Sequence, residues 1–85
     1  MIDEYRAQIT AADRILLGAV NQRLALVREL HEHKTAEGMP LRDQAREDAL
    51  VRELQAENPG PLSDDGVADL FRYVLDLTRR ELHGD

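Results

Sequence analysis

Cysteine is absent from this sequence of 85 residues, and aromatic side chains are scarce. The lack of cysteine excludes disulfide bonds, thiol catalysis and cysteine-ligated metals. Phe71, Tyr5 and Tyr73 are the only aromatic residues, so the fold must be stabilised by aliphatic packing. At this length we expect a single domain over residues 1–85, with a core that is only marginally sufficient by itself.

The sequence also lacks an excess of positive charge and a long hydrophobic run. Its formal net charge is -6 at pH 7, which would repel nucleic acids and anionic membranes, so we expect neither as a partner. Asp3 and Glu4 follow Met1 almost at once, and no apolar stretch of about 18 residues occurs. The sequence therefore predicts no signal peptide, no membrane span and a cytoplasmic location.

Proline and glycine gather at only two places, Gly38-Met39-Pro40 and Pro59-Gly60-Pro61. They divide the chain into three segments with helical periodicity, and no segment alternates like a β-strand. Asp43 and Ser63 precede the second and third segments and are good N-cap residues. We therefore expect an all-α chain of three helices.

The first segment predicts an unusually long helix. A helix from Ile2 to Lys34 would be roughly 50 Å long, about twice the diameter expected of a globule of this size. Two shorter helices cannot cover it, so we expect an intertwined helical homodimer in which a second copy covers the remainder. The apolar stripe of this helix consists of Ile2, Tyr5, Ile9, Ala12, Leu16, Ala19, Val20, Val27 and Leu30.

Two cationic residues lie close to this stripe. Arg23 and Lys34 are 11 residues apart and differ by only about 20° around the helix axis. Cations on a buried face require a counter-ion, which is either an acidic neighbour or a bound anion. Arg6 points roughly a quarter turn away, so it could reach the same cluster only from the partner of an antiparallel dimer. Each of these residues taken alone is by default a solvated side chain.

Other polar residues also have ordinary structural interpretations. Glu47 and Asp43 are by default a first-turn acid and a helix cap. Thr78 is by default a residue at the core edge that bonds back to its own helix. His31 and His33 point to different helix faces, which makes them a poor metal pair.

Taken together and in order, these residues resemble the all-helical, AroQ-type chorismate mutases over nearly the whole chain. In the first segment the family pattern is Leu-Arg, Ile, Asp, a pair of aliphatic residues, Arg and Lys. The matching residues here are Tyr5-Arg6-Ala7-Gln8-Ile9, Asp13, Ile15-Leu16, Arg23 and Lys34. Later in the chain, Leu41-Arg42-Asp43-Gln44-Ala45-Arg46-Glu47 resembles the family motif Val-x-Asp-x-x-Arg-Glu. Leu70-Phe71 resembles the Leu/Ile-Phe pair that anchors the third helix of the family.

The resemblance implies an isomerase that rearranges chorismate to prephenate, in the shikimate pathway to phenylalanine and tyrosine. Such enzymes use no cofactor and no metal. They hold the dianionic substrate in a compact conformer and stabilise charge on its ether oxygen. Arg23 and the partner's Arg6 would clamp the two carboxylates, because guanidinium groups bind carboxylates well. Lys34 would donate to the ether oxygen, and Arg46 would support the carboxylate end.

The resemblance also implies roles at the other end of the substrate. Glu47 would accept a hydrogen bond from the substrate hydroxyl, with the backbone near Asp43 helping. Thr78 stands where the family has a small hydroxyl residue near a carboxylate. Leu82, one turn later, departs from the family, since many relatives have Gln or Glu there as a second donor to the ether oxygen. Glu81 faces about 100° away, and losing one such donor costs about 3 kcal/mol of transition-state stabilisation.

The C-terminal stretch Leu77–Gly84 resembles the tail of an actinobacterial subclass. Members of that subclass are poor mutases alone and are activated by DAHP synthase. The resemblance therefore makes DAHP synthase a candidate partner of this chain. From the residues alone, Arg79 and Arg80 suit the negative end of the helix dipole.

Three alternatives stay open. Isochorismate pyruvate lyase and 4-amino-4-deoxychorismate mutase share the fold and the cationic pocket, and the departure at Leu82 favours them. The third is a non-catalytic helical dimer, a regulatory or interaction module. In such a module the cations Arg23, Lys34 and Arg46 would only form interhelical ion pairs, with Glu29, Glu47 or Glu53.

Overall fold

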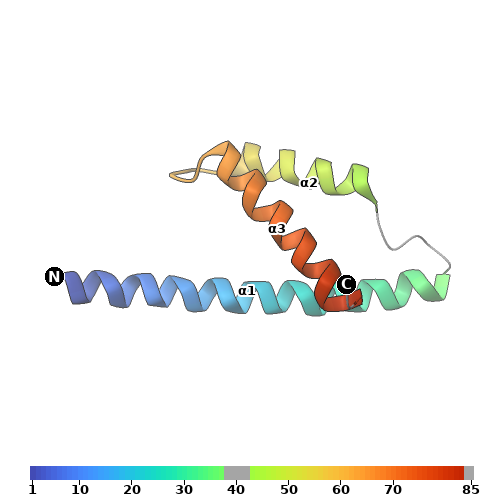
Figure 1. Ribbon diagram of the computed structural model, residues 1–85, viewed down its shortest axis with the longest axis horizontal. Coiled ribbons are helices and arrows are strands. Elements are labelled where there is room, and N and C mark those ends of the chain that lie inside the picture. Colours follow the sequence, from blue (N-terminus) through green and yellow to red (C-terminus); the bar gives the residue numbers. More distant parts are fainter. Residues whose placement is uncertain (38–42, 84–85) are drawn as a thin grey trace.

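The computed structural model describes residues 1–37 and 43–83, with the backbone alone at residues 34–37 and 83. The described chain is three helices, α1 (Ile2–Glu37), α2 (Gln44–Glu57) and α3 (Asp64–His83), without a strand (Figure 1). The all-α fold predicted from the sequence is therefore confirmed. Among the described residues, no helix combines the length and the hydropathy needed to cross a membrane.

Both predicted N-caps are present. The Asp43 carboxylate accepts a hydrogen bond of 3.0 Å from the backbone N–H of Arg46, which satisfies a free donor in the first turn of α2. The Ser63 hydroxyl does the same for α3, accepting from the backbone N–H of Gly66 at 2.9 Å. These caps mark where α2 and α3 begin.

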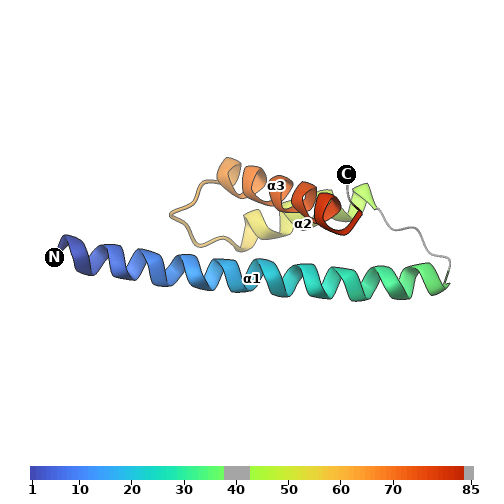
Figure 2. The ribbon, with the colours of Figure 1, turned by 60° about the horizontal axis from the view of Figure 1, so that its bottom comes forward.

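α2 and α3 form a helical hairpin with a small core (Figure 2). Asn58 ties the turn together, since its side chain donates to the Leu62 carbonyl and accepts from the Gly60 backbone N–H. Within the described residues the buried apolar side chains all come from this hairpin: Val51, Val67, Val74 and Leu75. α1 packs against α3 and, within the described residues, makes no close backbone contact with α2.

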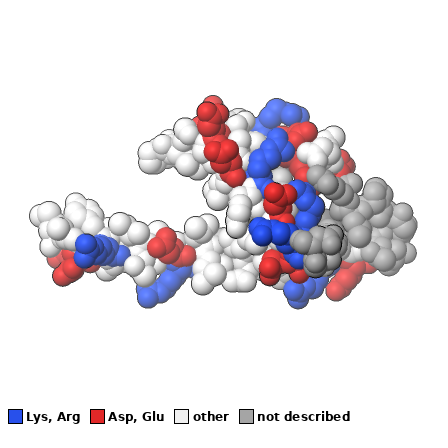
Figure 3. Space-filling view, viewed as in Figure 1, with Lys and Arg blue, Asp and Glu red and all other residues white. Residues whose placement is uncertain are grey.

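The first half of α1 projects away from the hairpin. The longest dimension of the molecule is 55 Å and its radius of gyration is 15.7 Å, against about 12 Å for a compact chain of this length. Ile9 and Leu16 on the projecting half are 61% and 54% exposed. In Figure 3 the edge of this arm that faces the hairpin is largely free of charge, and a notch separates the two. A large apolar surface of this kind is typical of an uncovered interface.

Candidate active site

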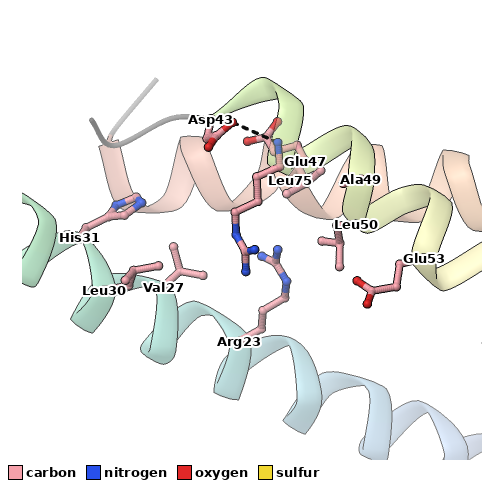
Figure 4. Close-up of a pocket in the computed structure, with 11 residues that line it drawn as sticks. Arg23, Val27, Leu30, His31, Asp43, Glu47, Ala49, Leu50, Glu53 and Leu75 are labelled. Carbon is pink, nitrogen blue, oxygen red and sulfur yellow. Dashed lines mark hydrogen bonds between the residues drawn. The ribbon is translucent and has the colours of Figure 1, made fainter. Parts of the chain in front are cut away.

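A pocket of about 220 Å³ lies between α1 and α2, with α3 behind it (Figure 4). Its charged and polar lining comes from Arg23 and His31 of α1 and from Asp43, Arg46, Glu47 and Glu53 at α2. Its apolar lining is Val27, Leu30, Ala49, Leu50 and Leu75. The pocket therefore combines two guanidinium groups, a histidine and three carboxylates with an aliphatic wall.

Arg23 is held in place by α3. Its guanidinium donates a hydrogen bond of 2.9 Å to the hydroxyl oxygen of Thr78, and the Thr78 hydroxyl in turn donates to the Val74 carbonyl at 2.7 Å. Thr78 is only 7% exposed, so its hydroxyl is a buried partner for the half-buried Arg23. The structural interpretation of Thr78 is confirmed, since its side chain bonds back to its own helix. Thr78 does not line the pocket itself but contacts Arg23, which does. Its hydroxyl orients Arg23 toward α2.

Neither guanidinium of the pocket has a carboxylate partner in the described part of the chain. The ion pairs found there are Arg72–Asp48, Arg79–Glu47 and Arg79–Asp76. A non-catalytic module would pair Arg23 or Arg46 with an acid, and these pairs are absent among the described side chains. Two like charges that line one pocket are stabilised by an anion bound between them. The net charge of the chain is -6, so acidic residues are in excess. The two arginines of the pocket are therefore unpaired, within the described residues, although enough acids exist to pair with them.

Glu47 is held by Arg79, a residue that the sequence analysis did not assign to the site. One guanidinium nitrogen of Arg79 lies 3.1 Å from each Glu47 carboxylate oxygen, and the other lies 2.5 Å from Asp76. The hydrogen bonds to Asp76 and Glu47 raise the pKa of Arg79 above its ordinary value, against desolvation. Glu47 therefore lines the pocket with its position fixed from behind by α3.

The remaining predicted site residues have different positions. Asp43 caps α2 and lines the pocket. Arg6 is exposed on the projecting half of α1, about 25 Å along the helix from Arg23, and lies outside the pocket. Leu82 is half-buried one turn beyond Thr78 on a helix that continues to His83, but it is not a lining residue. The side chain of Lys34 lies outside the described residues.

Sequence reasoning missed several lining residues. Val27, Leu30 and His31 follow Arg23 by four, seven and eight residues, which is the spacing of one helix face. That spacing could have identified His31 as a neighbour of Arg23. Glu53 was considered only as an ion-pair partner. Among the described residues, no group of three or more His, Cys, Asp or Glu side chains could hold a metal ion.

Comparisons with known proteins identify the family of this chain. Residues 5–82 match the family described as chorismate mutase type II. Two solved structures of chorismate mutase from Thermus thermophilus are similar to this chain. Form I has a TM-score of 0.88 and 31% identity over 91% of this chain and 96% of its own; Form II has a TM-score of 0.87 and 31% identity over 91% and 88%. A search of curated proteins found no match.

The family match leaves out only a few residues at either end of the chain, and the solved chorismate mutases share the arrangement of all three helices. The resemblance that the sequence predicted is confirmed. The chain belongs to the type II chorismate mutase family.

Proposed function

We propose that this protein is a chorismate mutase that converts chorismate to prephenate for phenylalanine and tyrosine synthesis. One observation carries the proposal: Arg23 and Arg46 line the same small pocket without a carboxylate partner among the described residues. Chorismate carries two carboxylates, and guanidinium groups are the preferred ligands for carboxylates. The aliphatic wall beside the arginines suits the carbon ring of the substrate.

The reaction is an intramolecular rearrangement, so the protein needs to supply only shape and charge. The ether C–O bond breaks as a C–C bond forms within the same molecule, and no atom enters or leaves. Arg23, oriented by Thr78, would hold a carboxylate, and Lys34 would donate to the ether oxygen as negative charge develops there. Glu47, fixed by Arg79, would accept from the substrate hydroxyl. Holding the substrate in its reactive conformer removes much of the entropic barrier.

We propose further that the active form is an intertwined homodimer in which the partner's Arg6 completes each site. The pocket of about 220 Å³ is smaller than the roughly 300–1,000 Å³ of complete small-molecule sites. The exposed apolar stripe on the projecting half of α1 and the notch beside it (Figure 3) fit an antiparallel α1 of a second copy. Such a copy would bring Arg6 toward the pocket that its own chain cannot reach.

Other parts of the interpretation stay predictions. We propose a cytoplasmic location and a single domain over residues 1–85. The same holds for activation by DAHP synthase and for the weak catalysis expected from Leu82. Since the family supports a reaction on chorismate-type molecules, isochorismate and 4-amino-4-deoxychorismate are the alternative substrates to test.

The experiment is a comparison of the three compounds with the purified chain. We expect prephenate from chorismate, with kcat/KM for chorismate the largest of the three, and a loss of turnover in Arg23→Gln. Pyruvate release from isochorismate, or turnover of the amino compound alone, would assign one of the alternatives. A transition-state analogue at about 100 times its Kd should stabilise the fold by about 2.7 kcal/mol. No turnover and no stabilisation would indicate a non-catalytic module.

A further inference from the structure

We propose that Arg79 is a specificity-determining residue, which makes the pocket prefer a neutral hydroxyl over a protonated amine at the substrate position facing Glu47. Arg79 does this by compensating the charge of Glu47 from behind the pocket. The inference rests on the proposed function, in which Glu47 accepts from the substrate hydroxyl. It concerns a residue that does not line the pocket and that would act through Glu47.

Arg79 contacts the Glu47 carboxylate but does not itself line the pocket. Glu47 is a lining residue, and both of its carboxylate oxygens lie 3.1 Å from one nitrogen of Arg79. The side chains of Arg79 and Glu47 are 30% and 18% exposed, so solvent screens this pair less than a surface pair. Arg79 also holds Asp76, whose side chain is 66% exposed, so that carboxylate is the better screened of the two.

This geometry changes what Glu47 can select. A carboxylate accepts a hydrogen bond from a hydroxyl or from an ammonium group, but an ammonium group adds a full positive charge. With Arg79 in place, that charge would lie across one carboxylate from a guanidinium, and the two cations repel each other. A neutral hydroxyl meets no such repulsion. Arg79 therefore favours chorismate over its 4-amino analogue, in which a protonated amine replaces the hydroxyl.

The chain offers a matched control for this contact. Arg72 and Asp48 also join α3 to α2, at 2.8 Å, but their side chains are 50% and 37% exposed and neither lines the pocket. The test uses wild type, Arg79→Gln, Arg79→Lys and Arg72→Gln. For each, kcat/KM is measured with chorismate and with 4-amino-4-deoxychorismate, and the ratio of the two is compared. Both values come from the same sample. Partial unfolding of a variant lowers the two kcat/KM values by the same factor and therefore leaves their ratio unchanged.

We expect Arg79→Gln to raise the ratio of amino compound to chorismate by roughly fivefold to tenfold, the effect of one partly buried charge pair. Arg79→Lys keeps the charge and should stay close to wild type, as should Arg72→Gln. An unchanged ratio in Arg79→Gln, or an equal rise in Arg72→Gln, would overturn the proposal. Arg79→Lys behaving like Arg79→Gln would also overturn it, since charge would then not be the cause.

The proposed function and this inference fail in different ways. If wild type converts neither compound, the proposed function is wrong. The dissociation constants of both compounds, measured by titration calorimetry with the same four proteins, then test the effect of Arg79 on binding preference. If the dissociation constant of the amino compound divided by that of chorismate falls only in Arg79→Gln, the inference is supported; if it does not change there, the inference is wrong. If wild type forms prephenate and the kcat/KM ratio does not respond to Arg79→Gln, only the inference is wrong.

Discussion

Replacing Thr78 by valine should separate the orientation of Arg23 from the stability of the fold. The Thr78 hydroxyl accepts from the Arg23 guanidinium at 2.9 Å and donates to the Val74 carbonyl at 2.7 Å. Valine has nearly the same shape without the hydroxyl. The Val74 carbonyl retains its regular helical partner, so the main loss is the hydrogen bond that fixes Arg23.

The size of the effect follows from the burial of the two partners. A hydrogen bond to a charged group is worth about 1.5–3 kcal/mol when its partner is left unsatisfied. Arg23 is half-buried, so water can replace part of the contact, and the lower end of this range applies. About 1.4 kcal/mol of transition-state stabilisation corresponds to roughly a tenfold loss in kcat/KM. Valine keeps the aliphatic packing, so the loss of stability should not exceed the about 1.5 kcal/mol of this hydrogen bond.

Thr78→Ser is the matched control, because it keeps the hydroxyl and removes the buried methyl group. It should retain most of kcat/KM and lose about 1 kcal/mol of stability. The assay combines initial rates of prephenate formation with thermal unfolding of the three proteins. Equal kcat/KM for wild type and Thr78→Val would refute the role given to this hydrogen bond. So would a larger catalytic loss in Thr78→Ser than in Thr78→Val.

Three further predictions use other parts of the molecule. Leu82→Gln should raise turnover, by up to roughly a hundredfold for a well-placed donor; unchanged rates with and without DAHP synthase would contradict this. Hydrogen bonds from Arg72 and Gln44 lower the pKa of Asp48 below 3.8, so the stability from this contact is present above pH 3.8 and lost as pH falls further. The Tm gap between wild type and Arg72→Gln should therefore close in acid, and a constant gap would be inconsistent with the pair. Ile9→Asp should yield monomers in sedimentation experiments, whereas Thr10→Asp on another face should not; a dimer that survives Ile9→Asp would argue against the α1 interface.

Local signals in the sequence were enough to predict the helices. The two Pro- and Gly-containing stretches marked the breaks, and Asp43 and Ser63 cap α2 and α3 as expected. The ordered family spacing also selected residues that the fold brings together, since Arg23, Asp43, Arg46 and Glu47 all line one pocket. The prediction of the helices succeeded because helix breaks and caps depend on neighbours within one or two helical turns.

The contact between Arg79 and Glu47 could not be predicted in the same way. The two residues are 32 positions apart and lie on different helices. Thr78 and Arg79 are adjacent but point about 100° apart, so one contacts α1 and the other α2. Which helix each would contact depends on how α3 packs between its neighbours, and the periodicity of α3 does not specify that packing. From local sequence Arg79 was simply a cation near a helix end.

The most direct test of the shared, two-chain site is a subunit-mixing experiment with Arg6→Ala and Arg23→Ala. Each variant alone should form almost no prephenate, because every site in its homodimer lacks one arginine. After subunit exchange, each heterodimer keeps one site with both arginines, so the mixture should recover a substantial fraction of wild-type activity. If exchange is confirmed and no prephenate forms, Arg6 does not complete the site of the partner and the account is wrong.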